Sequence, residues 1–482
     1  MTNQTFDVVI IGAGPVGENV ADRIVQGGLT AAIVERELIG GECSYWACMP
    51  TKALLRDAAA LRAVRQLPGA NAAVTGDLDI AAVLRRRDAF ASHWKDDGQA
   101  DWLASAGITL FRGEGSIGGI RSVNVVGADG ETVVLHARHA VVVATGSSAR
   151  IPSSIEGLSD AAPWTSREAA SAATVPARLA IIGGGVVATE MATAFSAFGS
   201  HVTIVARNGL LPAVEPFASE LAATSLRAAG VDLRLDTEPT RIARDASGEV
   251  HLDLADGTSL SADEVLVATG RNPNTTTLGL QNIGLTPGDW LVVDDALRVI
   301  RPSGAPAAGD WLYAAGDVNR RVLLTHQGKY QARILGDSIV ARANGTAIDD
   351  TAWGRHAFTA DDRAVPQVIF GDPEIATVGF TVAEATRRGI NLRAVEYDLA
   401  AVAGAALHAD GYEGRALMVV DEDRKVIVGF TMAGPDVAES LHAATIAIAG
   451  EVPLDRLWHA VPSYPTVSEV WLRLLETYGR DA

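Results

Sequence analysis

The feature that most constrains the fold is a pattern that occurs twice: an apolar strand, a glycine-rich turn and a helical stretch. The first copy joins the strand Phe6–Ile11 to Gly12-Ala13-Gly14-Pro15-Val16-Gly17, and the second joins Leu179–Ile182 to Gly183-Gly184-Gly185-Val186-Val187-Ala188. In such turns the first glycine permits the bend, the second lets the backbone approach a pyrophosphate, and the third lets the helix pack on the strand. The chain is therefore predicted to hold two α/β units, each with a nucleotide at a helix N-terminus.

Each unit also ends in an apolar strand that closes on the same Ala-Thr-Gly triplet. These strands are Val141-Val142-Val143-Ala144-Thr145-Gly146 and Val265-Leu266-Val267-Ala268-Thr269-Gly270. Glycine turns without a nucleotide would not readily explain this duplication. The candidate cofactor-binding residues of the triplets are Ala144, Thr145, Gly146 and Gly270.

The two units differ where a ribose would bind. The strand Ala31–Val34 ends in Glu35, an acid placed to accept hydrogen bonds from ribose hydroxyls. The strand His201–Val205 is followed by Ala206 and Arg207. A missing acid removes repulsion against a 2′-phosphate, and a guanidinium can bind one. We predict that the second unit prefers NADPH to NADH, and Ala188 in place of a third glycine points the same way. The alternative is that Arg207 is only a solvated charge.

Both cysteines of the chain, Cys43 and Cys48, lie in one segment, Gly40-Gly41-Glu42-Cys43-Ser44-Tyr45-Trp46-Ala47-Cys48-Met49-Pro50-Thr51-Lys52. A bridge across so short a loop would stabilise a large domain little. A zinc site needs about four ligands, and no second Cys/His cluster lies nearby. A helix start favours the thiolate, so the pair is predicted to be redox-active.

The composition and net charge of the chain limit the kinds of partner that it is expected to bind. A hydrophobic content of 48% with 20% charged residues is typical of a soluble globular protein. The net charge of −18 opposes binding to nucleic acid or an anionic membrane. The apolar run Val8–Ile11 is short and leads into a glycine turn, so we expect neither a signal peptide nor a membrane span. A cytoplasmic location is expected, where disulfides are normally catalytic.

With these motifs in order, the chain resembles the class I pyridine nucleotide–disulfide oxidoreductases, a family of flavoprotein disulfide reductases. Two further motifs carry the likeness: Leu312-Tyr313-Ala314-Ala315-Gly316-Asp317-Val318 and the segment Val365–Gly379. The resemblance implies an α/β fold, with two Rossmann-like nucleotide-binding domains for FAD and NAD(P) and an α+β C-terminal dimerisation domain. The implied boundaries are 1–150 and 272–347 for the FAD domain, 151–271 for the NAD(P) domain and 348–482 for the interface domain. A homodimer whose active sites are shared across the interface is implied as well.

The resemblance also implies residue roles. Asp317, after Gly316, would bind the flavin ribityl chain, and Gly41 would lie at the same cofactor. NADPH would reduce FAD, and FAD would reduce the disulfide, with Cys48 nearest the flavin and Cys43 attacking the acceptor. Lys52 and Glu190 would form an ion pair near flavin N5. A cation there stabilises anionic reduced flavin, and a buried lysine without a counter-ion would lose its proton.

The chain departs from the family near its C-terminus. Disulfide-reducing members end in His-x-His-Pro-Thr-x-x-x-Glu, whereas here Tyr464 replaces the second histidine and Glu469 remains. A phenol with a reference pKa near ~10 is a poor base at neutral pH, so turnover of ordinary disulfides should be slow.

The acceptor class therefore stays open. It would be a quinone, a dye-like electrophile, a metal ion or an unusual disulfide. The alternatives are a conventional dihydrolipoamide dehydrogenase-type disulfide reductase and a soluble transhydrogenase-like enzyme, although the latter typically lacks the second cysteine. Mercury reduction would need a further C-terminal cysteine pair, which this chain does not contain. A non-catalytic protein with a flavin fold is opposed by the intact Cys43, Cys48, Lys52 and Glu190.

Overall fold

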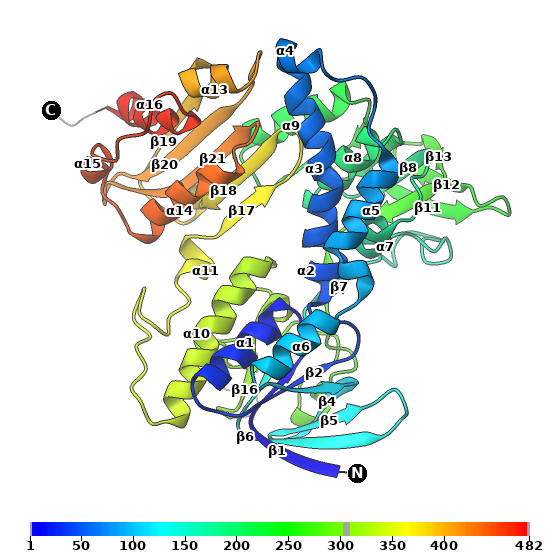
Figure 1. Ribbon diagram of the computed structural model, residues 1–482, viewed down its shortest axis with the longest axis vertical. Coiled ribbons are helices and arrows are strands. Elements are labelled where there is room, and N and C mark those ends of the chain that lie inside the picture. Colours follow the sequence, from blue (N-terminus) through cyan, green and yellow to red (C-terminus); the bar gives the residue numbers. More distant parts are fainter. Residues whose placement is uncertain (1, 302–308, 480–482) are drawn as a thin grey trace. The chain divides into compact units, whose positions relative to one another are not determined.

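The computed structural model describes residues 2–301 and 309–479, and it has a mixed α/β architecture (Figure 1). The chain divides into two compact units. The first unit consists of Met1–Pro50, Asp88–Arg150 and Gly270–Asp361, and the second consists of Thr51–Arg87, Ile151–Thr269 and Asp362–Ala482. Among the described residues, no helix is both long and apolar enough to cross a membrane.

The first unit is built on a sheet with the strand order β3-β2-β1-β6-β5-β4, and β16 pairs with β6. The strands are β1 (Thr2–Ile11), β2 (Ala31–Glu35), β3 (Thr109–Arg112), β4 (Glu114–Gly119), β5 (Ser122–Val126), β6 (Thr132–Val143) and β16 (Leu312–Ala314). The strands β1, β2, β6 and β16 run parallel. Residues that follow them therefore meet at one edge, where ligands of open α/β sheets bind.

Two helices of the first unit, α1 (Pro15–Gln26) and α10 (Thr325–Ala343), lie side by side (Figure 1). One apolar cluster joins Ile10 and Ile33 of the sheet to Leu335 of α10. A second cluster contains Ile11 and Ile117 and covers the opposite side chains of the strands. Burial of both strand faces explains why β1 and β2 read as continuous apolar runs. The unit also contains α2 (Gly41–Tyr45), α6 (Asp97–Ser105), β7 (Ser147–Ala149) and β15 (Arg271–Pro273).

The second unit contains a parallel sheet with the order β10-β9-β8-β14. Its strands are β8 (Arg178–Ile182), β9 (His201–Ala206), β10 (Asp232–Leu235) and β14 (Glu264–Val267). The helices of this region are α5 (Ile80–Phe90), α7 (Ser166–Ser171), α8 (Val186–Ala197) and α9 (Pro216–Ala228). Helix α3 (Cys48–Arg65) lies in this unit from Thr51 onward. A smaller antiparallel sheet is formed by β11 (Pro239–Arg244), β12 (Val250–Leu254) and β13 (Ser259–Ala262).

The C-terminal part of the second unit is an antiparallel sheet with the order β17-β18-β21-β20-β19. Its strands are β17 (Pro366–Ile369), β18 (Glu374–Gly379), β19 (Leu392–Asp398), β20 (Arg415–Asp421) and β21 (Val426–Gly434). Helix α14 (Leu441–Ala449) packs on β18 and β21, and α16 (Val470–Tyr478) packs on β19 and β20 (Figure 1). The shorter helices are α11 (Ala360–Arg363), α12 (Val382–Arg387), α13 (Ala403–His408) and α15 (Leu454–Leu457).

The predicted fold class is confirmed: the first unit has a mixed sheet in which, among the described strands, only the pairs β4–β5 and β5–β6 are antiparallel, and the second unit has a parallel sheet and a separate antiparallel C-terminal sheet. Each predicted apolar strand is observed, as β1, β2, β6, β8, β9 and β14. The boundaries predicted for the FAD, NAD(P) and interface domains stay predictions.

Candidate functional site

The first glycine loop has the geometry that a nucleotide diphosphate requires. Gly12 has φ +103°, and a Cβ there would lie 2.4 Å from the carbonyl oxygen of Ala144. A Cβ on Gly17 would lie 1.9 Å from the carbonyl oxygen of Gly12, so helix α1 packs directly on the loop. A Cβ on Gly14 would meet nothing within 4 Å. Only the middle glycine faces open space, at the N-terminus of α1, where phosphates bind.

The acid at the end of β2 is held in a fixed position. Glu35 Oε2 accepts a hydrogen bond from Ala13 N at 2.8 Å, and Glu35 Oε1 accepts one from Glu37 N at 2.8 Å. A cavity of about 70 Å³ lies beside Glu35 and is also lined by Gly12, Gly115 and Thr145. The predicted ribose acceptor and the glycine loop therefore border the same cavity.

The residues at this edge of the sheet fit FAD. The hydroxyl oxygen of Thr145 is buried, and no described residue forms a hydrogen bond with it. A buried hydroxyl without a partner costs about 1–3 kcal/mol, which a polar ligand would remove. The triplet that contains Thr145 follows β6, and its Gly146 has φ +69° with open space in front. Gly41 has φ +54°, and a Cβ there would lie 3.1 Å from Gly14 Cα. A side chain at Gly41 would therefore press on the phosphate loop.

Asp317 lies in a network that sequence reasoning predicted only in part. Ser147 Oγ donates to Asp317 Oδ2 at 2.6 Å, and Arg271 Nε donates to Ser147 Oγ at 2.6 Å. Arg271 lies 3.7 Å from Asp317 and 3.9 Å from Glu42. Gly316 N donates to the buried Gln331 Oε1 at 2.8 Å. Arg271 was not predicted, and the one feature that pointed to it is its place directly after the triplet glycine Gly270.

The two cysteines lie together as thiols in the first unit. Cys43 belongs to α2, and Cys48 begins α3. A hydrogen bond with Cys48 raises the pKa of Cys43 well above the usual range of a thiol, and burial raises it further. Thr325 and Lys329 act in the opposite direction on the same pKa. Two neighbouring sulfurs resist carrying two negative charges, so the two thiols titrate as a coupled pair.

Thr325 and Lys329 are site residues that the sequence analysis missed. Thr325 Oγ1 lies 3.4 Å from Cys48 Sγ, and Thr325 is the first residue of α10. Lys329 lies one turn further along the same helix. The positive charge of Lys329 and the positive end of the α10 dipole both favour a thiolate. The only sequence signal was that this helix follows the Gly316-Asp317 motif.

Lys52 and Glu190 are brought together within the second unit. Lys52 Nζ lies 2.8 Å from Glu190 Oε2, and Phe370 N donates to Glu190 Oε1 at 3.0 Å. The Glu190 residue is only 3% exposed. The ammonium also lies 5.1 Å from the centre of the Phe370 ring. Both carboxylate oxygens of Glu190 therefore have a partner, which fixes the position of the Lys52 charge.

The second glycine loop repeats the open middle position. Gly183 has φ +122°, a Cβ there would lie 2.3 Å from Ala268 O, and a Cβ on Gly185 would meet nothing within 4 Å. Ala188 is fully buried at the third position. Arg207 follows β9, and its side chain is 67% exposed. It lies 3.3 Å from the exposed Glu238, a weak surface pair that a ligand phosphate could replace. Gly270 has φ +117° at the end of the second triplet.

The structure does not join Tyr464 to Glu469. Tyr464 is 75% exposed, whereas Glu469 is 6% exposed. Glu469 Oε1 accepts a hydrogen bond from Arg473 at 2.5 Å, and Glu469 Oε2 has no hydrogen-bond partner among the described residues. Tyr464 therefore receives no orientation from the carboxylate.

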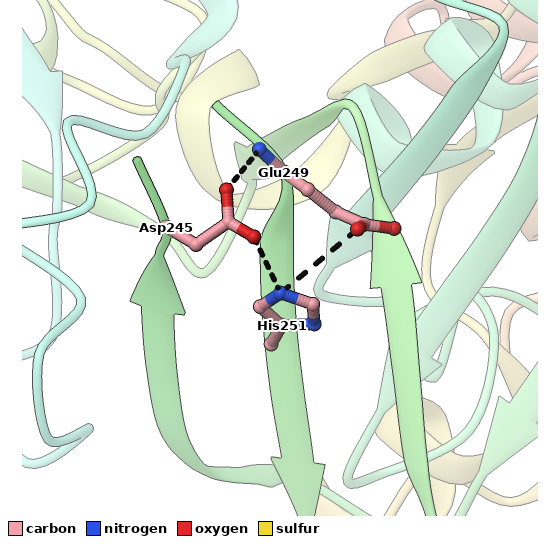
Figure 2. Close-up of side chains that lie close together, drawn as sticks. All are labelled: Asp245, Glu249 and His251. Atoms are coloured by element: carbon pink, nitrogen blue, oxygen red, sulfur yellow. Dashed lines mark hydrogen bonds and ion pairs between the residues drawn. The ribbon is translucent and has the colours of Figure 1, made fainter. Parts of the chain in front are cut away.

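A group of possible metal ligands on the surface belongs to a different region. Asp245, Glu249 and His251 surround the β11–β12 turn (Figure 2). Asp245 Oδ1 accepts a hydrogen bond from Glu249 N at 3.1 Å, and Asp245 Oδ2 lies 3.2 Å from His251 Nε2. Hydrogen bonds from Ser247 and His251 lower the pKa of Asp245 far below its usual range. These contacts stabilise the turn, and we assign no ligand to it.

The comparisons with known proteins agree with this geometry. The family model described as pyridine nucleotide-disulphide oxidoreductase matches residues 6–332, and its dimerisation-domain model matches residues 365–474. The chain therefore belongs to the pyridine nucleotide–disulphide oxidoreductases. Membership makes it a flavin-dependent oxidoreductase that uses FAD and NAD(P)H, with a C-terminal dimerisation domain.

Relatives of two kinds cover nearly the whole chain. Mercuric reductase from Acidithiobacillus ferrooxidans is 33% identical over 488 residues, which cover 99% of this chain and 83% of that protein. Dihydrolipoyl dehydrogenase from Chlamydia pneumoniae is 30% identical over 477 residues, which cover 97% of this chain and 96% of that protein.

Two solved structures share the fold. The Cu(II) complex of the HOCl-induced flavoprotein disulfide reductase RclA from Escherichia coli gives a TM-score of 0.82 at 24% identity, covering 98% of this chain and 99% of that one. LpdA from Mycobacterium tuberculosis gives 0.81 at 24% identity, covering 99% of both chains. At this identity the likeness supports the fold alone.

Proposed function

We propose that this protein oxidises NADPH and passes the electrons through FAD to the Cys43–Cys48 pair and then to a small acceptor. The observation that carries the proposal is the mutual contact of the two thiols beside Thr325 at the start of α10. Bound FAD would accept hydride from NADPH and deliver two electrons to the disulfide.

The chain's own residues would hold the charges of this reaction. Lys52 supplies a positive charge that favours the anionic reduced flavin, and its ion pair with Glu190, at 2.8 Å, holds that charge in place. Asp317 and Gly41 would hold FAD, as would the first glycine loop. Arg207 would hold the 2′-phosphate of NADPH, which supports NADPH over NADH as the donor.

The reduced pair can transfer electrons in a balanced exchange. With a disulfide acceptor, the Cys43 sulfur attacks one acceptor sulfur after losing its proton, and the other acceptor sulfur leaves as a thiolate. The Cys48 thiolate then attacks Cys43, which restores the Cys43–Cys48 disulfide and releases the second acceptor thiol. The first step needs a base for the Cys43 proton, and the exposed Tyr464 is a poor one.

We therefore propose an acceptor that needs little help from a base, such as a quinone or another electrophile. A conventional disulfide reductase of the dihydrolipoamide dehydrogenase kind is the second candidate, supported by the likeness to that enzyme over 97% of the chain. The likeness to mercuric reductases does not make mercury the acceptor. Mercury reduction would need a second cysteine pair, and both cysteines of this sequence lie in one loop.

A homodimer with shared active sites is part of the proposal. Residues 365–474 match the dimerisation domain of the family. Val461 and Tyr464 are 85% and 75% exposed, which is unusual for apolar and aromatic side chains and is consistent with cover by a partner.

Anaerobic stopped-flow reduction by NADPH tests the electron path. The expected result is bleaching of the yellow flavin, followed by a long-wavelength charge-transfer band between flavin and thiolate. Cys48→Ser should keep the bleaching and lose the band, whereas Cys43→Ser should show the band before NADPH is added, because its Cys48 cannot form a disulfide, and should lose the band when the flavin is bleached. A colourless protein that cannot be reconstituted with FAD, or a band that survives in Cys48→Ser, would refute the proposed path.

Steady-state turnover with lipoamide and with a quinone tests the acceptor. The wild type is expected to reduce the quinone faster, and Tyr464→His should raise lipoamide turnover by about 100-fold or more, within the range of general-base catalysis. Fast lipoamide turnover by the wild type with no gain in Tyr464→His would favour the second candidate.

A further inference from the structure

The second unit contains a cavity of about 480 Å³ outside its nucleotide loop. The cavity lies between α3, α8 and α9, next to the loop that carries Asp372. Residues that line it include Leu61, Arg62, Arg65, Leu78, Phe198 and Leu226. Its volume falls in the range of sites for small organic ligands. Neither Gly183–Ala188 nor Arg207 lines it. We call it the α3–α8 cavity.

The α3–α8 cavity combines an apolar wall with two arginines that differ in how firmly they are held. Arg62 Nε lies 2.9 Å from Asp372 Oδ2, and the Asp372 side chain is 40% exposed. Arg65 Nη2 lies 3.5 Å from Asp77 Oδ1, and the Asp77 side chain is fully exposed. A long ion pair with an exposed partner contributes little. Arg65 can therefore exchange Asp77 for a ligand anion at small cost.

We propose that the α3–α8 cavity binds a small amphiphilic carboxylate. Its apolar chain would lie on Leu61, Phe198 and Leu226, where burial of apolar surface supplies most of the affinity. Its carboxylate would bind the guanidinium of Arg65, whose planar donors match carboxylate geometry. A neutral or cationic amphiphile would gain the first interaction without the second.

The position of the α3–α8 cavity connects it to the Lys52–Glu190 pair. Helix α3 carries both Lys52 and the cavity residues Arg62 and Arg65. Helix α8 carries Glu190 and, one turn later, the cavity residue Thr193. Asp372 follows two residues after Phe370, whose N–H binds Glu190. Glu190 lies on α8 and is contacted by α3 and by the segment that contains Phe370 and Asp372. All three segments also line the cavity.

Ligand binding in the cavity should therefore change the rate at which NADPH reduces the flavin. A ligand between α3 and α8 would shift the two helices that position Lys52 and Glu190. This coupling, though not the binding itself, rests on the proposed function.

Binding is tested by isothermal titration calorimetry on the FAD-containing protein with three probes of equal chain length: decanoate, decanamide and decylamine, each below its micelle concentration. Decanoate should bind at one site per chain and bind at least about 5-fold more tightly than the other two. Equal binding of all three probes, or no binding of decanoate, would overturn the proposal.

Substitutions inside and outside the α3–α8 cavity test where decanoate binds. Arg65→Ala should weaken decanoate about 5- to 10-fold, as expected for an exposed charge contact of roughly 1 kcal/mol. Ala197→Trp, which places a large side chain in the cavity, should abolish binding, and the exposed Arg234→Ala outside it should leave binding unchanged. Weakening by Arg207→Glu with no effect of Arg65→Ala would place decanoate in the nucleotide site and refute the proposal.

Stopped-flow reduction by NADPH tests the coupling. Saturating decanoate should change the reduction rate of the wild type at least about 2-fold and leave Ala197→Trp unchanged. An unchanged wild-type rate with confirmed binding would refute the coupling alone. Absence of NADPH reduction without decanoate would refute the proposed function, while the calorimetry would still decide the binding.

Discussion

The two glycine loops share the positions that a diphosphate requires and differ elsewhere. In both loops the first glycine has positive φ, and a Cβ there would lie within 2.4 Å of a carbonyl oxygen of the triplet that follows the neighbouring strand. In both loops the middle glycine, Gly14 or Gly185, faces open space. The shared part of the loop is therefore the backbone path and the space in front of it.

The differences lie at the third position and at the end of the second strand. A Cβ on Gly17 would lie 1.9 Å from the carbonyl oxygen of Gly12, whereas Ala188 carries a methyl group and is fully buried. Glu35 is fixed by two backbone N–H groups, whereas Arg207 is an exposed charge with a weak partner. At the ribose position the first unit thus has a hydrogen-bonded acid, and the second has an exposed positive charge.

The largest effects are expected from acids at the open middle positions. Gly14→Asp should fold but lose FAD, with affinity lower by at least about 100-fold, because a carboxylate would face the diphosphate. Gly185→Asp should keep the yellow flavin and lose NADPH-dependent bleaching. Flavin absorbance per chain and stopped-flow reduction measure the two losses.

Gly14→Asn and Gly185→Asn are the matched controls, since they add similar volume without charge. They should lose less affinity than the acids. If Gly14→Asp retained FAD, or if both acids abolished the same cofactor, the assignment of one nucleotide to each loop would be wrong.

The next effect concerns the third position. Gly17→Ala should destabilise the protein by about 2–4 kcal/mol, because its Cβ would lie 1.9 Å from Gly12 O and the helix would have to move. Ala188→Gly should cost only about 1–2 kcal/mol, from lower helix propensity and a lost methyl group. Urea unfolding of both variants measures the difference, and equal losses would contradict the proposed difference in helix packing.

Arg207→Glu sharpens the comparison of the two ribose positions. The ratio of kcat/KM for NADPH to that for NADH should fall about 10- to 100-fold, the loss expected for a charge-assisted contact with a phosphate. Glu238→Gln should shift the ratio slightly toward NADPH, because it removes the competing partner of Arg207. An unchanged ratio in Arg207→Glu would mean that Arg207 does not bind the 2′-phosphate and is only a solvated charge.

The last difference depends on pH and concerns Glu18 of α1, whose counterpart in α8 is Thr189. Burial raises the pKa of Glu18 to about 7. Between its usual value near 4.5 and about 7, the unfolded chain loses this proton while the folded protein keeps it, so folding stability falls as pH rises through that window. Glu18→Gln should therefore have no advantage at pH 4 and gain up to about 3 kcal/mol by pH 8. Thermal unfolding of the holoprotein at both pH values measures the gain, and a gain independent of pH would contradict this origin.

Features that depend on local sequence were predictable. The apolar strands, the glycine loops and the acid at Glu35 all lie within one continuous segment of each unit, where the residue order determines the backbone path. The Lys52–Glu190 contact joins two segments, and only the family resemblance suggested it.

Features that depend on distant chain segments were not predictable. Thr325 and Lys329 reach the cysteines because α10 packs beside α1, nearly 300 residues away in the sequence. The separation of the exposed Tyr464 from the buried Glu469 depends on how the C-terminal turn folds.

The start of α10 has a consequence for the equilibrium between disulfide and dithiol. Leu324 is the N-cap residue of this helix, and no side chain caps it. The amide dipoles at the start of α10 favour a negatively charged sulfur at Cys48 and have little effect on a neutral disulfide. The helix start would therefore shift the equilibrium of a Cys43–Cys48 couple toward the reduced form. The disulfide would accept electrons more readily, and the dithiol would donate them less readily.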